Sequence, residues 1–318
     1  MRRLVPLLVA VVALLTPHVA QAQPRIGVLL FGTPATDPNV AAFRRALADL
    51  GYVEGRNVRL EYRGAEGKAE RLPDLARDLV GLKPDVVFAL GGDVAPAVKS
   101  ATTTIPVVAV VSLDPVQGGL IGSMARPGGN ITGVTLIASD LAGKRLQFLK
   151  EIAPAVSRVG VLWNPAHPDF EYRETRSAGH RLGVQVQSLE VRNAGEFEAA
   201  FRAAAEARAQ ALVVASSRLT TANLRRILGL AARHRMLVVS GWGPWAQEGA
   251  LLSYGPDIDA VIRRAATQVD KILKGALPGE LPIEQPTKFE LVINAKTARA
   301  SDLAIPPSLA AHADRIIE

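Results

Sequence analysis

Short continuous apolar runs, each followed by a stretch with helical periodicity, recur along this chain. Residues 25–31 (RIGVLLF) form one such run, and residues 158–163 (RVGVLW) form another with the same plan. Unbroken apolar strands alternating with helices indicate parallel sheets covered by helices on both faces. The sequence therefore predicts an α/β protein, and the restart of the pattern predicts two similar units.

The first unit is expected to contain strands at 25–31, 57–62, 85–90, 106–111 and 131–137, with helices at 40–50, 74–82 and 94–101. The second begins near residue 141. Its expected strands are 158–163, 184–189, 211–215 and 236–240, and its expected helices are 141–152, 172–182, 194–207 and 221–235. The tail adds strands at 251–254 and 289–293, a helix through Ile258–Ile272 and a helix at 295–303.

Two units that share a tail predict two Rossmann-like, doubly wound lobes between which the chain crosses several times, forming a multi-strand hinge. We expect lobe one to comprise residues 23–140 plus about 255–283. Lobe two is expected to comprise residues 141–254 plus about 284–318.

The N-terminus has the layout of a secretory signal peptide. Arg2 and Arg3 precede an apolar stretch, residues 4–15, that is too short to span a bilayer. Ala20-Gln21-Ala22 then places small residues where a signal peptidase reads them. We expect cleavage after Ala22 and a periplasmic mature chain.

Composition excludes several classes of protein. The 318 residues contain no cysteine, which excludes disulfides, thiolate chemistry and the lipid anchor of a bacterial lipoprotein. Removal of Arg2 and Arg3 leaves 35 basic and 30 acidic residues, a net charge of 35 − 30 = +5. The basic residues are interspersed with acids and form no run with aromatics, so no nucleic-acid partner is expected.

The sequence shows no catalytic or metal-binding pattern. The four histidines after the signal segment are scattered, and we interpret them as surface residues: His167, His180, His234 and His312. The sequence contains no nucleophile elbow, Walker A motif or G-x-G-x-x-G motif. We therefore expect no enzyme, no metal and no cofactor. Gly91-Gly92-Asp93 opens a helix, where its amides can face an anion or Asp93 can simply cap the helix.

Polar residues gather at the ends of the expected strands. In open parallel sheets, ligands bind outside the carboxyl ends of the strands, and two facing lobes would bring these ends together across a cleft. Turn formation or capping is the alternative role for any single one of them. The predicted ligand-binding set comprises Thr33, Gly91, Gly92, Asp93, Ser112, Asp114, Thr135, Asn164, Ser216, Ser217 and Trp242.

Trp242 and Trp245 lie in a loop that contains glycine and proline and not on a periodic apolar face. Core packing is therefore less favoured for them than is usual for tryptophan. An aromatic wall that stacks on a flat ligand is the alternative that we adopt for Trp242.

Several segments together resemble the bacterial ABC-transporter substrate-binding family that includes tryptophan-binding importer proteins. They are ARPGGNITGVT (125–135) after Asp114-Pro115-Val116, VLWNP (161–165), GALLSYGPD (249–257) and EQPTKFELVINAKTA (284–298). The resemblance spans the whole mature chain. It implies the type I periplasmic binding protein fold, a monomer that delivers a small molecule to a membrane permease, and a separate ATPase subunit.

The chain departs from that family at one strand end of lobe two. Members that bind an amino acid are expected to place a carboxylate there, whereas this chain has Ser216-Ser217-Arg218. Arg218 can attract a carboxylate instead. The expected ligand is an aromatic amino acid or a related planar acid. A ligand sensor for a membrane receptor and an enzyme on the same fold are the alternative functions.

Overall fold

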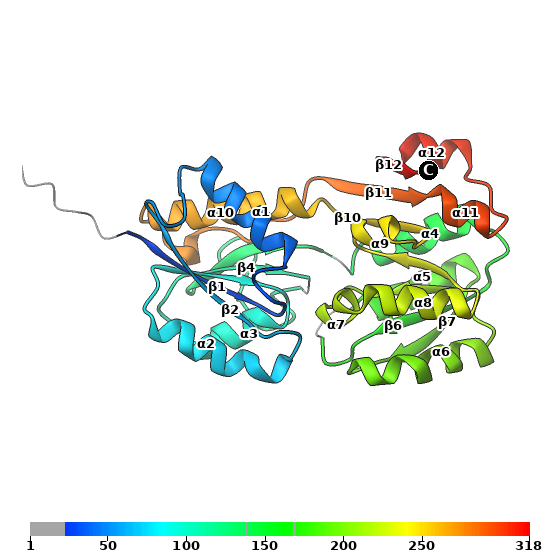
Figure 1. Cartoon of the computed structure of the whole chain (residues 1–318), viewed down its shortest axis with the longest axis horizontal. Helices are drawn as coiled ribbons and strands as arrows, with labels where there is room; N and C mark the ends of the chain where they lie inside the picture. The colour runs from blue at the N-terminus through cyan, green and yellow to red at the C-terminus, as the bar shows by residue number, and fades with distance from the viewer. Residues whose placement is uncertain (1–22, 113, 138, 168–169) are drawn as a thin grey trace, which may run out of the picture.

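The structure is a computed structural model that describes residues 23–112, 114–137, 139–167 and 170–318. It consists of two α/β lobes side by side, built on a five-stranded and a seven-stranded sheet (Figure 1). The predicted two-lobed α/β fold is confirmed. The predicted signal segment lies outside the described residues. Within the described residues, no helix is both long and apolar enough to span a bilayer.

Lobe one is built on a parallel sheet with the strand order β2-β1-β3-β4-β5. Three of its strands, β1, β3 and β4, are buried almost along their whole length, as their uninterrupted apolar sequences predict. The strands are β1 Arg25–Leu30, β2 Arg59–Gly64, β3 Val86–Leu90, β4 Val107–Val111 and β5 Ile131–Thr135. The associated helices are α1 Pro38–Asp49, α2 Leu72–Gly81, α3 Val94–Ala101 and α10 Ile258–Leu273.

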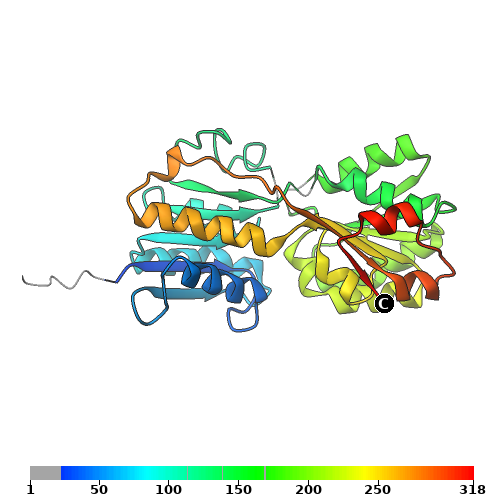
Figure 2. The ribbon, with the colours of Figure 1, turned by 90° about the horizontal axis from the view of Figure 1, so that it is seen from above.

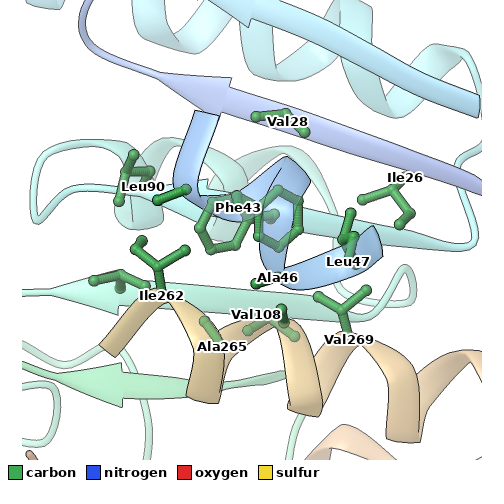
Figure 3. Close-up of a cluster of buried hydrophobic side chains, with 14 of the residues drawn as sticks. Ile26, Val28, Phe43, Ala46, Leu47, Leu90, Val108, Ile262, Ala265 and Val269 are labelled. Carbon is green, nitrogen blue, oxygen red and sulfur yellow. The ribbon is translucent and has the colours of Figure 1, made fainter. Parts of the chain in front are cut away.

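Helices far apart in sequence cover one face of this sheet together. The α1 helix lies beside α10, and Phe43 of α1 stacks on Phe88 of β3 with ring centroids 4.0 Å apart. Figure 3 shows side chains of α1 and α10, among them Phe43 and Ile262, meeting over Val108 of the sheet. The α2 and α3 helices cover the opposite face. The α10 helix is therefore part of the core of lobe one, although it follows most of lobe two in the sequence.

Lobe two has a mixed sheet with the strand order β12-β11-β10-β9-β8-β6-β7, in which only the β10–β11 pair is antiparallel. The strands are β6 Arg158–Trp163, β7 Gln185–Glu190, β8 Ala211–Val214, β9 Leu237–Ser240, β10 Leu252–Pro256, β11 Phe289–Asn294 and β12 Arg315–Ile317. The helices are α4 Ala142–Ile152, α5 Glu171–Leu182, α6 Phe197–Glu206, α7 Arg218–Ala222, α8 Leu224–Arg233, α9 Gly243–Gln247, α11 Ala295–Ala300 and α12 Pro307–His312. Short 3-10 turns occupy Ala69–Arg71, Ala194–Glu196 and Pro278–Glu280.

Some elements of lobe two differ from their predicted form. The helix expected at 221–235 is divided into α7 and α8 at Asn223. It also begins earlier than predicted, because Ser217 and Thr220 form a capping box that starts α7 at Arg218. Strand β12 was not predicted, since three residues at a chain end carry too little periodicity to show.

The chain passes between the lobes after β5, after β10 and again before β11 (Figure 2). Backbone hydrogen bonds tie these crossings together: Thr135 N–H donates to Glu284, and Asp257 N–H donates to Lys288. The multi-strand connection is as predicted. The residue boundaries assigned to each lobe stay a prediction.

Asp257 fixes the start of α10 where the chain enters lobe one. Its carboxylate accepts the Ala260 N–H at 3.0 Å and the Lys288 ammonium at 2.8 Å. Burial by itself raises the pKa of Asp257, but the Lys288 and Ala260 donors outweigh it and hold this pKa below 3.8.

We predict that Asp257→Ala lowers the free energy of unfolding by about 1 kcal/mol at neutral pH, because it removes the N-cap. Because the folded-state pKa is depressed, this contribution is complete above the unfolded pKa and is lost as the pH falls through the folded one. Urea denaturation at neutral and acidic pH measures both effects. The matched control is Asp259→Ala, in the exposed first turn of the same helix. Equal losses from both variants would contradict the role of Asp257.

Candidate functional site

The carboxyl ends of the two sheets face each other and bring side chains of both lobes into contact. Lobe one contributes the loop after β3, with Asp93, and Ser112 after β4. Lobe two contributes His167 from the loop after β6 and Arg218 from the start of α7, which follows β8. The contacts below define the candidate site as the place where these loops meet.

His167 of lobe two is hydrogen bonded to lobe one through both ring nitrogens. Its Nε2 lies 2.8 Å from Ser112 Oγ and its Nδ1 lies 2.6 Å from Asp93 Oδ1. The side chain is 3% exposed. With a proton on Nδ1, the ring donates to the carboxylate and accepts from the hydroxyl. The prediction that His167 is a surface residue is therefore wrong.

Asp93 was open to two interpretations, an N-cap or a site residue. Within the described residues, its side chain makes no capping hydrogen bond to α3. It bonds to His167 of lobe two instead. The geometry thus favours the site interpretation, although ligand contact by Asp93 stays a prediction.

Arg218 is a second side chain that reaches from lobe two to lobe one. Its Nη2 donates to the Leu90 carbonyl at 3.0 Å, at the end of β3. Removal from water lowers the pKa of the guanidinium, and the carboxylates of Asp37 and Asp93 oppose that shift. Arginine keeps its charge under any physiological condition, so the site holds a permanent cation whose charge Asp37 and Asp93 of lobe one stabilise.

Two consecutive glycines of lobe one make room for these two side chains. A Cβ on Gly92 would lie 2.6 Å from His167 Cε1, and a Cβ on Gly91 would lie 2.9 Å from Arg218 Nε. Gly91 also has a φ of +127°, which side chains rarely tolerate, whereas Gly92 does not. The Gly91-Gly92 pair therefore leaves the space that the Arg218 and His167 side chains of lobe two occupy. The sequence did not suggest this role.

Lobe two holds a buried ion pair beside the interlobe contacts. Arg145 of α4 donates through Nη1 to Glu171 at 2.7 Å and through Nε to the Tyr254 carbonyl at 2.8 Å. Glu171 also accepts the backbone N–H of Ser216 at 2.9 Å. Both charged side chains are fully buried. This pair anchors the predicted site residue Ser216 from beneath.

Polar atoms around this ion pair are buried without a hydrogen-bond partner in the described part of the chain. Arg145 Nη2 and Ser216 Oγ are two of them, and both lie within 3 Å of where a Cβ on Gly241 would be. Gly241 is thus the residue that allows β9 to end close to the guanidinium. A side chain at this position would have to displace the buried ion pair.

The two tryptophans predicted to avoid the core behave differently. Trp245 is 1% exposed and packs in the core of lobe two, so the prediction fails for this residue. Its loop folds into the short helix α9, whose inner face the pattern did not reveal. Trp242 is only partly buried and packs against the apolar cores of both lobes. Its role as an aromatic wall stays a prediction.

Several predicted site residues serve local structure or lie apart from the interlobe contacts. Asp114 accepts the Val116 and Gln117 amides in a turn, and Asn164 accepts the Ala166 amide in another. Ser217 caps α7, and Thr33 is exposed. The turn and capping alternative therefore describes the observed contacts of Asp114, Asn164 and Ser217. Thr135 is buried at the end of β5 beside the crossing segment.

The residues missed by sequence reasoning are His167, Arg145, Glu171 and Asp37. Arg145 and Glu171 lie within amphipathic helices, where a charged residue is normally read as solvent-facing. His167 had a usable signal: it follows the end of a predicted strand by a few residues, as Ser112 and Asp93 do. The described residues contain no group of three or more metal-ligating side chains.

Two surface hollows of about 370 and 240 Å³ flank α1 on lobe one. Their lining includes Arg44, Tyr52 and Asp259, and none of the predicted site residues. The hollows therefore lie apart from the predicted site residues.

We predict that Glu171→Ala lowers the free energy of unfolding by about 3–5 kcal/mol, because it leaves the Arg145 guanidinium buried without its counter-charge. Chemical denaturation measures the loss. The double variant Arg145→Met/Glu171→Leu removes both charges and should recover most of it. A single variant as stable as the wild type would show that the ion pair is not required. A double variant less stable than the single would show that the burial of a lone charge is not the cause.

Comparison with known proteins places this geometry in a family. The chain is 24% identical over 287 residues to a tyrosine-binding protein of Clostridioides difficile, with 89% of this chain and 82% of the relative covered. A conserved domain protein of Vibrio cholerae has a TM-score of 0.86 at 26% identity, covering 92% of this chain and 99% of that one. A domain from Streptococcus pneumoniae in complex with L-Trp also has a TM-score of 0.86, at 22% identity, covering 93% of this chain and 100% of that one. The model of the ABC transporter substrate binding protein family matches residues 25–317, and the chain therefore belongs to this family.

Proposed function

We propose that this protein captures an aromatic amino acid or a related planar acid between its lobes, in the periplasm, and delivers it to an ABC permease. One observation carries the proposal: charged and polar side chains of both lobes converge on the loop after β3. Groups that are already aligned and partly removed from water bind a polar ligand strongly once the lobes exclude solvent.

The charges at this site complement a ligand that carries both an ammonium and a carboxylate. Lobe one supplies the carboxylates of Asp93 and Asp37, and lobe two supplies the Arg218 guanidinium. The acid that the sequence of lobe two lacks at Ser216-Ser217-Arg218 is thus replaced by acids of lobe one. The absence of an acid at that strand end is consequently no argument against an amino-acid ligand.

Relatives support the aromatic part of the proposal. One is named as a tyrosine-binding protein and another was crystallised with L-Trp. In this chain, Trp242 packs against the apolar cores of both lobes, and this packing supports its indole as the wall that stacks on a flat ligand.

We predict that the mature protein, residues 23–318, is stabilised by an aromatic amino acid or aromatic acid in a thermal-shift screen that also includes sugars and nucleosides. A ligand present at about 100 times its Kd adds about 2.7 kcal/mol of stability, enough for a shift of several degrees. A shift with sugars or nucleosides alone would reject the proposed ligand class.

We further predict that Trp242→Ala and Ser216→Ala each weaken binding of the ligand found in that screen by about tenfold or more, as measured by isothermal titration calorimetry. Loss of ring stacking or of a buried hydrogen bond accounts for a change of this size. Ser100→Ala, at an exposed position of α3, is the control. Unchanged affinity in both site variants would reject this placement of the ligand.

A ligand sensor would use the same clamp. Stimulation of the cognate transporter's ATPase by the ligand-loaded protein, in reconstituted membranes, distinguishes delivery to a permease from signalling to a receptor. Loaded protein that leaves the ATPase at its basal rate would favour the receptor.

The Ser112–His167–Asp93 chain favours one second function, acyl-ester hydrolysis, because it has the order of nucleophile, base and carboxylate. Ser112 Oγ would attack the ester carbonyl and pass its proton to His167 Nε2, which returns the proton to the leaving alkoxide. Water would then hydrolyse the acyl-serine. Fluorophosphonate labelling of Ser112, absent in His167→Ala, would establish this function. An unlabelled Ser112 would exclude it.

A further inference from the structure

We propose that His167 is an internal competitor of the ligand: its imidazole occupies the hydrogen-bonding groups of lobe one, Asp93 and Ser112, that the ligand must use. The inference rests on the proposed function, since it names a residue that sets affinity and selectivity at the same site. It assigns His167 a role opposite to that of an ordinary contact residue, because its removal should strengthen binding.

The contacts of His167 are those expected of a bound molecule. One ring nitrogen faces a carboxylate at 2.6 Å and the other faces a hydroxyl at 2.8 Å, and the ring is 3% exposed. Asp93 and Ser112 both belong to lobe one, at the ends of neighbouring strands β3 and β4. The imidazole therefore joins two groups of lobe one in the way that a small polar ligand would.

Gly92 provides an independent observation. A Cβ there would lie 2.6 Å from His167 Cε1, while its other close neighbour, Ser112 Oγ, is a rotatable hydroxyl at 3.2 Å. The φ of Gly92 is outside the left-handed region, so the backbone does not require glycine. Among the described contacts, only the imidazole of His167 requires that residue 92 has no side chain. The surface of lobe one is shaped to receive His167.

Competition follows from these contacts. A ligand that binds Asp93 or Ser112 must first break a hydrogen bond to His167, and the broken bond subtracts from the affinity. A ligand group that cannot donate to Asp93 would leave a half-buried carboxylate unpaired, which is costly. His167 thereby discriminates against molecules that lack a donor at this point.

Three variants test the proposal, with circular dichroism to confirm that each folds. His167→Ala removes the competitor. Gly92→Ala places a methyl group where the imidazole of His167 lies, and the double variant combines the two substitutions. The control is Gly81→Ala at the end of α2, where a Cβ has open space and φ is not left-handed. All are made in the mature chain, stripped of bound molecules by unfolding and refolding.

The first readout is the distance between the lobes. Because the chain has no cysteine, the substitutions Lys99→Cys on α3 and Arg225→Cys on α8 create two unique sites for spin labels. The distance between the two labels reports the distance between the lobes. We expect a mainly short distance in the wild type and in Gly81→Ala, and a longer one in His167→Ala and Gly92→Ala. The double variant should give the same distance as His167→Ala, because the methyl group added by Gly92→Ala has no steric clash once the imidazole ring is absent. A distance unchanged by His167→Ala would overturn the proposal.

The second readout is affinity for L-tryptophan and L-tyrosine by calorimetry. We expect His167→Ala to bind the better of the two about tenfold more tightly, the worth of one net hydrogen bond. Weaker binding would make His167 a ligand contact and overturn the proposal. If neither amino acid binds any variant, the proposed ligand class fails, while the interlobe distances still decide whether His167 joins the lobes.

Discussion

Parallel strands share one direction, and this constraint places every group of the candidate site. Once helices cover both faces of a sheet, polar residues can collect only at the strand ends, and the carboxyl ends of all parallel strands lie on one edge. Two such edges face each other in this protein. Asp93 and Ser112 on one side, and His167 and Arg218 on the other, are neighbours because of strand direction and not because of sequence proximity.

At the interface between the lobes, carboxylates of lobe one partly compensate the desolvation of a cation of lobe two. Arg218 loses hydration where it contacts Leu90, which destabilises its charge. The carboxylates of Asp37 and Asp93 in the opposite lobe offset part of this desolvation energy. Beneath it, Arg145 and Glu171 neutralise each other within lobe two. The lower pair can therefore stay fixed when the lobes move, while the upper contacts must be broken and remade. Lobe two thus combines an internal ion pair with hydrogen bonds that reach to lobe one.

Sequence patterns predicted the two-lobed fold because a buried parallel strand has a clear signature, and they placed Asp93, Ser112 and Ser216 because those residues directly follow such strands. They could not tell Asp93 from Ser217, since capping and binding use the same residue types at the same positions. Only the contacts separate them: Ser217 bonds to its own helix and Asp93 bonds to the other lobe. His167 and Trp245 were misread because burial in a loop depends on what another part of the chain brings to it.

A protein that captures and releases a small molecule needs lobes that meet in a defined way but do not stay together too firmly. Its ligand can shift the balance between open and closed forms only by the difference in its affinity for the two. The contacts of His167 and Arg218 fix how the two lobes meet. Where a ligand must replace these contacts, the gain in ligand affinity on closing is smaller. The Gly91-Gly92 pair makes both contacts possible by leaving space where other residues would hold the lobes apart. Two missing side chains in lobe one thus set how closely lobe two can approach.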